Sequence, residues 1–261
     1  MFNVQSEIEI KTLGQLAQAT DWRLKLAHDR PAPLLIWITR GQGRVLLDVQ
    51  RRGVGAHNAL FVPSGALFAL DLARHSIGHA LVLPQNTDLL FPSHAHHLRI
   101  RDVGSQAELT HEMEATQRED LSGRALRHDA LEAHAALISV WLRRQLALEE
   151  HLPDQPDAAG RISFGFCELL PERYRSGDAL AVYAKCLGVT ATHLTRAVKA
   201  ATGRTASELL AERLLHEARR LLKETSEPAQ SIARYLGFTS PAYFSRFMHQ
   251  HAGAPPSKLR N

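Results

Sequence analysis

The sequence predicts a two-domain protein: an N-terminal β-barrel followed by helices, and an all-α C-terminal domain with two helix-turn-helix motifs in tandem. Three observations predict this. Short apolar segments alternate with turn residues from Pro33 to Leu83, apolar residues recur at helical spacing after about Arg101, and residues 165–261 contain one unit written twice, about 50 residues apart. With 261 residues and 44% hydrophobic content, the chain is long enough for two packed cores.

The N-terminal barrel is predicted from strand-like segments at regular spacing. They are Leu34–Ile38, Val45–Val49, Asn58–Gly65 and Leu67–Leu70, and the first two flank a Gly41-Gln42-Gly43 turn. This arrangement favours a small antiparallel barrel or sandwich, with room for a pocket inside. Trp37, Phe61 and Phe68 either line such a pocket or belong to the core.

A helical region follows the strands. Its apolar stripe packs either on the barrel of its own chain or on a second copy in a dimer, and Trp141 and Leu137 widen it. The stripe consists of Leu131, Ala135, Ile138, Leu142 and Leu146. Residues 152–160 lack periodicity and are rich in Pro, Asp and Gly, which predicts a linker between domains. The expected organisation is a sensor barrel at 1–105, a helical dimerisation or connector region at 106–151, a linker at 152–163 and a DNA-binding domain at 164–261.

The repeated unit has the layout of a helix-turn-helix. Ala184–Val189 aligns with Ala233–Phe238, and Leu194-Thr195-Arg196 aligns with Phe244-Ser245-Arg246. Each copy has a short apolar helix pattern, a glycine where that helix would stop, and a second helix that carries an arginine. Two recognition helices are therefore predicted on one chain.

The ends of these helices are predicted from capping residues. In the first copy a helix over 179–187 ends at Gly188, and Thr190 caps a helix that runs to about Ala201. In the second copy Ser240 is the cap, Pro241 occupies the first turn, and the helix runs to about His251. Between the copies, residues 206–223 form one amphipathic helix that would set the distance between the two motifs. Its inward residues are expected to be Leu210, Leu214, Ala218, Leu221 and Leu222.

The charge distribution favours DNA as the partner of the C-terminal half. Residues 161–261 contain 15 Lys and Arg against 8 Asp and Glu, a net charge of +7, whereas residues 1–160 have a net charge of −3. Cationic side chains displace the counterions that condense on phosphates. Helical spacing places Arg196 and Arg246 on the exposed faces of the recognition helices, where an arginine can bind guanine O6 and N7 in a bidentate manner.

The C-terminal region, from about Phe166 to Arg260, resembles the DNA-binding domain of the AraC/XylS family of bacterial transcription regulators. The resemblance is carried by residues 232–238, by 240–247 and by Gly253 to Pro256. It implies two helix-turn-helix subdomains joined by a linker helix, with double-stranded promoter DNA as the partner. The candidate DNA-contacting residues are Thr192, Thr195, Arg196, Lys199, Ser240, Ala242, Tyr243, Ser245 and Arg246. Departures from the family pattern are Val198, Met248, Ala252 and the His249-Gln250 pair, which stands where a basic pair is common.

The N-terminal half resembles, over about residues 30–100, the cupin-like sensor domain found in many of these regulators. Because cupin-like barrels also occur in enzymes, one alternative is a metal-dependent enzyme fused to a DNA-binding domain. His75 and His79 lack the ligand spacing for this, and His94, His96 and His97 form a cluster without an assigned third ligand. A polar loop is the simpler interpretation of that cluster.

No catalytic motif is found, and no metal or cofactor is expected. Cys167 and Cys186 are expected to be reduced and structural. The N-terminus lacks signal-peptide features and the sequence has no long apolar run, so we expect a cytoplasmic protein that does not interact with membranes.

The sequence therefore predicts a noncatalytic, sequence-specific regulator of transcription of AraC type, an activator or a repressor, controlled by an unidentified small-molecule effector. A homodimer is expected, and RNA polymerase is a further candidate partner. A third alternative is a constitutive regulator whose barrel only dimerises.

Overall fold

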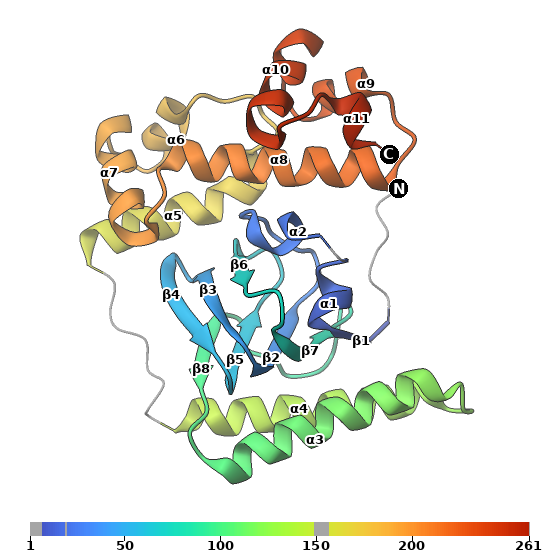
Figure 1. The fold of residues 1–261 in the computed structure, drawn as a ribbon. Helices are drawn as coiled ribbons and strands as arrows, with labels where there is room; N and C mark the ends of the chain where they lie inside the picture. Colours follow the sequence, from blue (N-terminus) through green and yellow to red (C-terminus); the bar gives the residue numbers. More distant parts are fainter. Residues whose placement is uncertain (1–6, 19, 149–156, 261) are drawn as a thin grey trace. The chain divides into compact units, whose positions relative to one another are not determined.

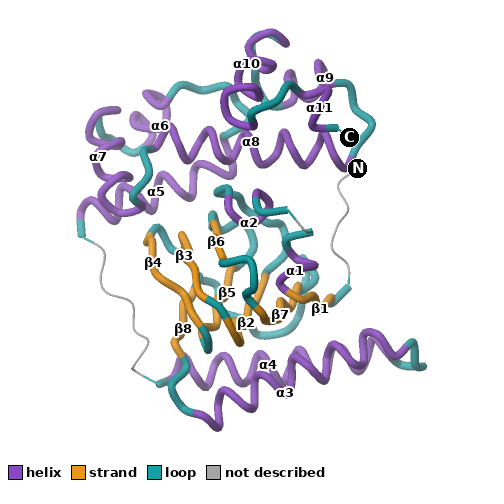
Figure 2. Tube along the Cα trace, viewed as in Figure 1, coloured by secondary structure: helices purple, strands orange, loops and turns teal. Residues whose placement is uncertain are grey.

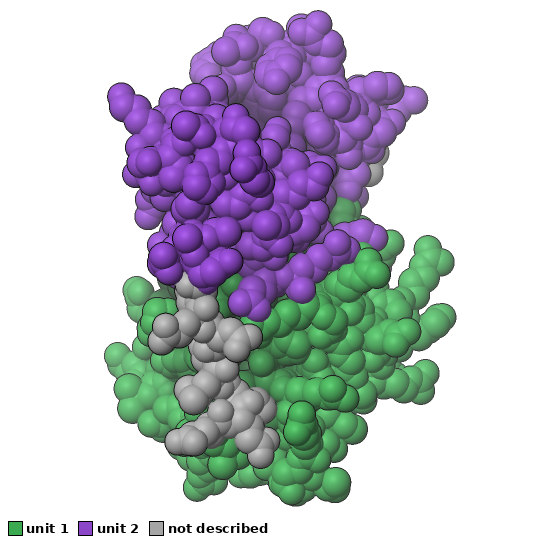
Figure 3. Space-filling model, turned by 90° about the vertical axis from the view of Figure 1, so that its left-hand side faces the viewer, with its two compact units in different colours: residues 1–24, 29–48, 52–155 green, residues 25–28, 49–51, 156–261 purple. Residues whose placement is uncertain are grey.

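A computed structural model describes residues 7–18, 20–148 and 157–260 (Figure 1). The chain divides into two compact units, one of residues 1–24, 29–48 and 52–155, the other of residues 25–28, 49–51 and 156–261 (Figure 3). None of the helices within the described ranges has the length and hydropathy that crossing a membrane requires.

The first unit is built around two antiparallel sheets, with two short helices near its start and two long ones at its end (Figure 2). Its strands are β1 (Glu9–Thr12), β2 (Leu34–Arg40), β3 (Gln42–Leu47), β4 (Gln50–Gly55), β5 (Asn58–Val62), β6 (Ala69–Leu72), β7 (Ile77–Val82) and β8 (His96–Arg99). Its helices are α1 (Leu13–Leu16), α2 (Trp22–Lys25), α3 (Val103–Ser122) and α4 (Arg127–Ala147). Five strands pair in the order β1-β7-β2-β5-β8, and three pair in the order β4-β3-β6.

The predicted barrel or sandwich is confirmed as a sheet-rich domain, and its described strands form two sheets that do not close into a barrel. The predicted strand Val45–Val49 was too long. Asp48 and Val49 have φ values of 49° and 63°, which form a tight hairpin turn into β4. Strand β4 was not predicted, because its QRRGVG sequence is polar and the turn lacks the usual Asn-Gly or Asp-Gly signal.

Strand β2 explains why the five-stranded sheet lies at the centre of this unit. Residues 34–38 are all buried, so both faces of the strand are covered. Alternate side chains point to opposite faces. Leu34, Ile36 and Ile38 join the core that also contains residues of β3 and β6, and Leu35 and Trp37 join a second core with α3 and α4.

Helices α3 and α4 lie side by side and cover the second face of the five-stranded sheet (Figure 1). The apolar stripe from Leu131 to Leu142 on α4 is buried in this core, and Leu146 is partly buried against it. Of the two alternatives for the stripe, packing within its own chain is therefore the one observed. Trp141 is also buried, whereas Leu137 is 53% exposed.

The aromatic side chains considered for a pocket belong to the packed cores. Trp37 and Phe61 lie in the core under α3 and α4, and Phe68 lies in the other core. The indole Nε1 of Trp37 donates a hydrogen bond of 2.9 Å to Thr110 Oγ1, and that of Trp141 donates one of 3.0 Å to the Ser105 carbonyl. Both buried polar groups are thus satisfied.

Two predicted boundaries differ from the structure. Helix α3 begins at Val103, after the cap Asp102, so its first residues fall in the segment assigned to the barrel. Helix α5 (Ala158–Arg173) occupies the second half of the expected linker 152–163, because Asp157 caps it by accepting a hydrogen bond from Gly160 N. Linker residues 152–156 lie outside the described residues.

The packing of α4 on the sheet predicts opposite outcomes for two leucine substitutions on that helix. Leu142→Ala removes a fully buried side chain and should cost about 2–5 kcal/mol of unfolding free energy. Leu137→Ala, at an exposed position, should stay within about 0.5 kcal/mol of the unmodified protein. Urea unfolding followed by tryptophan fluorescence measures both, because Trp22, Trp37 and Trp141 all belong to the first unit. Equal stability of the two variants would contradict the packing.

Candidate nucleic-acid interface

The first helix-turn-helix consists of α6 (Leu180–Cys186) and α7 (Ala191–Thr202), packed on α5. Helix α6 ends where Gly188, with φ of 67°, donates to the Lys185 carbonyl and Val189 N donates to the Ala184 carbonyl. This pair of hydrogen bonds defines the Schellman motif. The motif favours glycine at the position of Gly188, because that residue must adopt a left-handed backbone conformation. Helix α7 then begins after Thr190, whose Oγ1 accepts from His193 N.

The second helix-turn-helix repeats these contacts in α9 (Ala229–Tyr235) and α10 (Pro241–Ala252), followed by the short α11 (Pro256–Leu259). Gly237, with φ of 78°, donates to the Arg234 carbonyl, and Phe238 N donates to the Ala233 carbonyl. Ser240 caps α10 by accepting from Tyr243 N. The predicted ends of both recognition helices are therefore confirmed to within one residue.

The two recognition helices, α7 and α10, also share one pattern of burial. Residues 191–200 and residues 241–250 pass through the same order of exposed, half-buried and buried positions. Leu194, Ala197 and Val198 are buried in α7, and Phe244, Phe247 and Met248 are their counterparts in α10. The packed face of α7 therefore corresponds to the packed face of α10, and their exposed faces correspond in the same way.

The structure places eight of the nine candidate DNA-contacting residues on α7 and α10, outside the packed faces. Thr192, Arg196, Lys199, Ala242, Tyr243 and Arg246 are exposed, and Thr195 and Ser245 are half-buried. Ser240 is half-buried and stands just before α10, where its hydroxyl oxygen serves as the cap. Arg196 and Arg246 occupy equivalent exposed positions in the two copies.

Helix α8 (Ala206–Glu224) joins the two motifs and packs on both of them. The predicted continuous helix is confirmed, with Thr205 and Glu208 forming a capping box at its start. The predicted inward stripe is confirmed at Ala218, Leu221 and Leu222, which are buried, and is wrong at two leucines. Leu210 and Leu214 are only half-buried, whereas Leu209 and Leu215 are buried.

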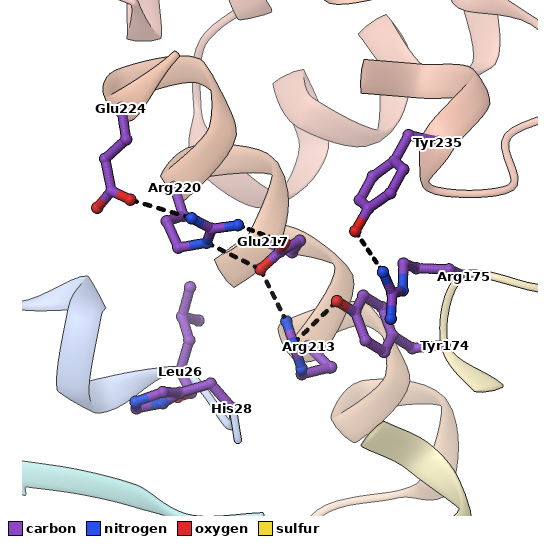
Figure 4. A network of polar contacts seen from close by, with 9 residues as sticks. All are labelled: Leu26, His28, Tyr174, Arg175, Arg213, Glu217, Arg220, Glu224 and Tyr235. Carbon is purple, nitrogen blue, oxygen red and sulfur yellow. Dashed lines mark hydrogen bonds and ion pairs between the residues drawn. The ribbon is translucent and has the colours of Figure 1, made fainter. Parts of the chain in front are cut away.

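Two further buried residues of α8, Arg213 and Glu217, are charged and belong to a polar network that sequence analysis missed (Figure 4). Arg213 Nη2 donates a 2.9 Å hydrogen bond to the hydroxyl of Tyr174, at the end of α5. Arg213 and Arg220 both pair with Glu217, and Arg220 also pairs with Glu224. The three- and four-residue spacing of these charges is visible in the sequence, but it does not indicate that they are buried.

The surroundings of Glu217 favour its charged form. Burial on its own raises the pKa of the Glu217 carboxyl. The hydrogen bonds from Arg220 and the charges of Arg213 and Arg220 together outweigh this effect, so the pKa lies below the usual range. The carboxylate therefore stabilises the fold at pH values above the ordinary glutamate pKa. This contribution disappears as the pH falls through the lowered pKa of the folded state.

The histidines singled out in the sequence lie in or just before strands β7 and β8. Within the described part of the chain, no group of three or more His, Cys, Asp or Glu side chains is arranged to hold a metal ion. The polar loop expected at His94–His97 is wrong in part, because His96 and His97 begin strand β8. His97 Nε2 lies 2.7 Å from Asn58 Oδ1, and burial, followed by the nearby His94, lowers the pKa of His96. Cys167 is buried and Cys186 is exposed, and the two are not joined in a disulfide.

The buried ion pairs predict a large difference between two glutamate substitutions on α8. Glu217→Ala leaves the Arg213 charge buried without this partner and should cost about 3–5 kcal/mol. Glu224→Ala, at the exposed end of the network, should cost at most about 1 kcal/mol. Hydrogen–deuterium exchange of the α8 amides measures both costs. As the pH is lowered below the ordinary glutamate pKa of about 4.3, the unmodified protein should lose protection and approach Glu217→Ala. A constant difference between the two proteins over that range would contradict the role of the carboxylate.

Residues 183–261 match a family described as Helix-turn-helix domain, which spans both motifs. Over 126 residues the chain is 27% identical to an uncharacterized HTH-type transcriptional regulator, YisR, of Bacillus subtilis (strain 168). That alignment covers 46% of this chain and 44% of the relative, so the chain spans less than half the length of the relative it matches.

Solved structures with some similarity include ToxT from Vibrio cholerae, with 12% identity over 97% of both chains and a TM-score of 0.44. Another is the C-terminal domain of the response regulator yesN from Fusobacterium nucleatum, with 22% identity, a TM-score of 0.36, and coverage of 37% of this chain and 94% of that one. The tandem motifs, their shared helix α8 and the family match lead to one conclusion. The C-terminal domain of this chain is a helix-turn-helix domain.

Proposed function

We propose that this protein is a transcriptional regulator that binds promoter DNA in a sequence-specific manner through α7 and α10. The observation that carries the proposal is the equivalent placement of Arg196 and Arg246 on two exposed helix faces with the same burial pattern. A surface arginine on its own has many explanations. Two arginines at equivalent positions of a duplicated helix-turn-helix are what a protein needs to contact bases in two segments of the major groove.

The chemistry of these faces suits DNA. The guanidinium groups of Arg196 and Arg246 can each bind the O6 and N7 atoms of a guanine, while Thr192, Thr195 and Ser245 can contact phosphates or a thymine methyl group. Lys199 in α7 adds a cation toward the DNA backbone, and its counterpart in α10 is a histidine, His249. We therefore expect α7 to contribute more phosphate affinity than α10. Tyr243, Ala242 and Ser240 complete the proposed contact set of the second motif.

The relative YisR is named a transcriptional regulator, which supports the same assignment for this chain. We further propose that the first unit is a noncatalytic sensor whose effector shifts the protein between states of different DNA affinity. The side chains of both cores of this unit are buried, so an effector that entered either core would displace packed side chains. A homodimer, if formed, must use a surface other than the buried α4 stripe.

The DNA proposal predicts the outcome of a capture experiment with fragmented genomic DNA and purified protein. The retained fragments should share a motif with two half-sites about 10 bp apart, one helical turn. The double variant Arg196→Ala, Arg246→Ala should lose this enrichment, because each bidentate contact contributes about 1–3 kcal/mol of base discrimination. Sequencing of the retained DNA measures both.

Arg143→Ala serves as the matched control, because Arg143 is an exposed arginine of α4 in the other unit. It should leave the enriched motif unchanged. The proposal would be contradicted if the retained DNA shared no motif and the double variant retained as much of it. Such a result would mean that the protein binds only to phosphates. A motif bound with the same affinity whatever metabolites are added would favour a constitutive regulator.

A further inference from the structure

The loop of residues 174–178, between α5 and α6, touches the turn of the second helix-turn-helix at close range. A methyl group placed on Gly177 would lie 2.7 Å from the carbonyl oxygen of Gly237, which is too short for any real contact. A methyl group on Gly237 would lie 2.5 Å from the Arg175 carbonyl oxygen and 2.6 Å from Gly177 N. Both glycines have left-handed φ values, 73° and 78°. The two backbones are therefore in direct contact.

The first helix-turn-helix lacks this contact. Gly188 is the counterpart of Gly237, with a similar φ of 67° and the same Schellman hydrogen bonds. A methyl group on Gly188 would meet no atom of the described chain within 4 Å, apart from its immediate neighbours. The two turns therefore have the same backbone geometry, but only the turn at Gly237 is covered by another segment. The left-handed conformation of the turn explains why both positions are glycine. It does not explain why the 174–178 loop covers Gly237 and not Gly188.

Two side chains at the start of the loop, Tyr174 and Arg175, hold it against α8 and α9 (Figure 4). Arg175 Nη1 donates a hydrogen bond to the hydroxyl of Tyr235 on α9, and its guanidinium lies 5.1 Å from the Tyr235 ring centre and 5.2 Å from that of Tyr174. The Tyr174 ring in turn lies 3.8 Å from the guanidinium carbon of Arg213 on α8. The loop is therefore anchored to the shared helix and to the second motif.

The loop is also stiffened from within. Arg173 Nη2 pairs with Asp178 Oδ2 at 2.7 Å across it, and the Ser176 hydroxyl donates to the Arg173 carbonyl and accepts from Asp178 N. Hydrogen bonding by Ser176, followed by that of Arg173, lowers the pKa of Asp178, so this carboxylate stays charged at neutral pH. A stiff loop can hold the elements that it contacts at a fixed distance and orientation from each other.

We infer that the 174–178 loop is a positioning element, which fixes the separation and phase of α7 and α10 and so restricts the protein to one spacing between DNA half-sites. This inference rests on the proposed function. A single shared helix, α8, lets the second motif pivot about it, whereas a second contact away from the axis of that helix blocks the pivot. One base pair of extra spacing moves a half-site by about 3.4 Å along the axis and turns it by roughly a tenth of a helical turn. A pair of motifs held in one arrangement cannot follow such a change.

The positioning itself can be tested without DNA, in the full-length protein. Spin labels at Ala200→Cys and Gln250→Cys, two exposed and equivalent positions, report the distance between α7 and α10, with the exposed Cys186 replaced by serine. Electron–electron resonance should give one narrow distance distribution. Gly177→Ala should broaden or shift it, because the added methyl group pushes the loop away from Gly237. Gly188→Ala is the matched control, with the same left-handed strain but no neighbour, and should leave the distribution narrow.

The restriction on spacing is measured by fluorescence anisotropy on DNA whose half-site spacing is changed by one or two base pairs. The unmodified protein and Gly188→Ala should both prefer one spacing by about tenfold or more, the equivalent of one lost base contact. Gly177→Ala should reduce this preference to about threefold or less, while its affinity for a single half-site changes by less than about twofold. Tyr235→Phe, which removes the acceptor for Arg175 without changing charge or backbone, should loosen the preference in the same direction.

These outcomes separate the two proposals. A narrow distance distribution and an unchanged spacing preference in Gly177→Ala and Tyr235→Phe, both folded by circular dichroism, overturn the positioning role even if DNA binding is specific. If Gly177→Ala does not fold, Tyr235→Phe decides the question alone. Absence of specific DNA binding by the unmodified protein defeats the proposed function, and the restriction on spacing fails with it. The distance measurement still decides whether the loop positions the motifs.

Discussion

Helix α8 is the element on which the C-terminal domain depends, because both helix-turn-helix motifs pack on it. A helix covered on two sides has few exposed positions, and here the covered positions include the charged side chains of Arg213 and Glu217. Buried charges are tolerated only when each has partners with good geometry. Glu217 meets this condition through Arg213 and Arg220, and Arg213 through Glu217 and Tyr174. The network therefore ties the shared helix to the end of α5 while it satisfies the buried charges.

The two copies of the helix-turn-helix have the same local geometry but different surroundings. Both copies use a threonine or serine cap, a Schellman glycine and three buried side chains at equivalent positions. They differ in the cation of Lys199 against the imidazole of His249, and in the loop that covers Gly237 but not Gly188. The first difference concerns how strongly each motif would hold phosphates. The second concerns how the two motifs are held relative to each other.

The first unit is organised by a sheet that is buried on both faces. Alternate residues of β2 enter different cores, so one strand links the helices α3 and α4 to the second sheet. Its polar groups, such as the Trp37 indole, are paired with side chains of α3. A ligand that entered either core would displace packed side chains, and a rearrangement there would move the α3–α4 hairpin or the second sheet. Such a repacking is the kind of change through which the proposed effector would act.

The sequence by itself determined the features that depend on residues a few positions apart. The caps Thr190 and Ser240, the left-handed Gly188 and Gly237, and the exposed arginines follow from hydrogen bonds and helical periodicity within single turns. The duplication made these signals stronger, because each was present twice. The family resemblance extended them to a domain and a class of partner.

Only the tertiary structure decided what the exposed and apolar faces meet. The α4 stripe could pack on its own sheet or on a second chain with the same local pattern, and the polar strand β4 is held by its pairing with β3 rather than by its composition. The Arg175–Tyr235 hydrogen bond joins residues 60 positions apart, and the Trp37–Thr110 bond joins residues 73 apart. Such contacts leave no periodic trace in a sequence, because their partners are brought together by the folding of the elements between them.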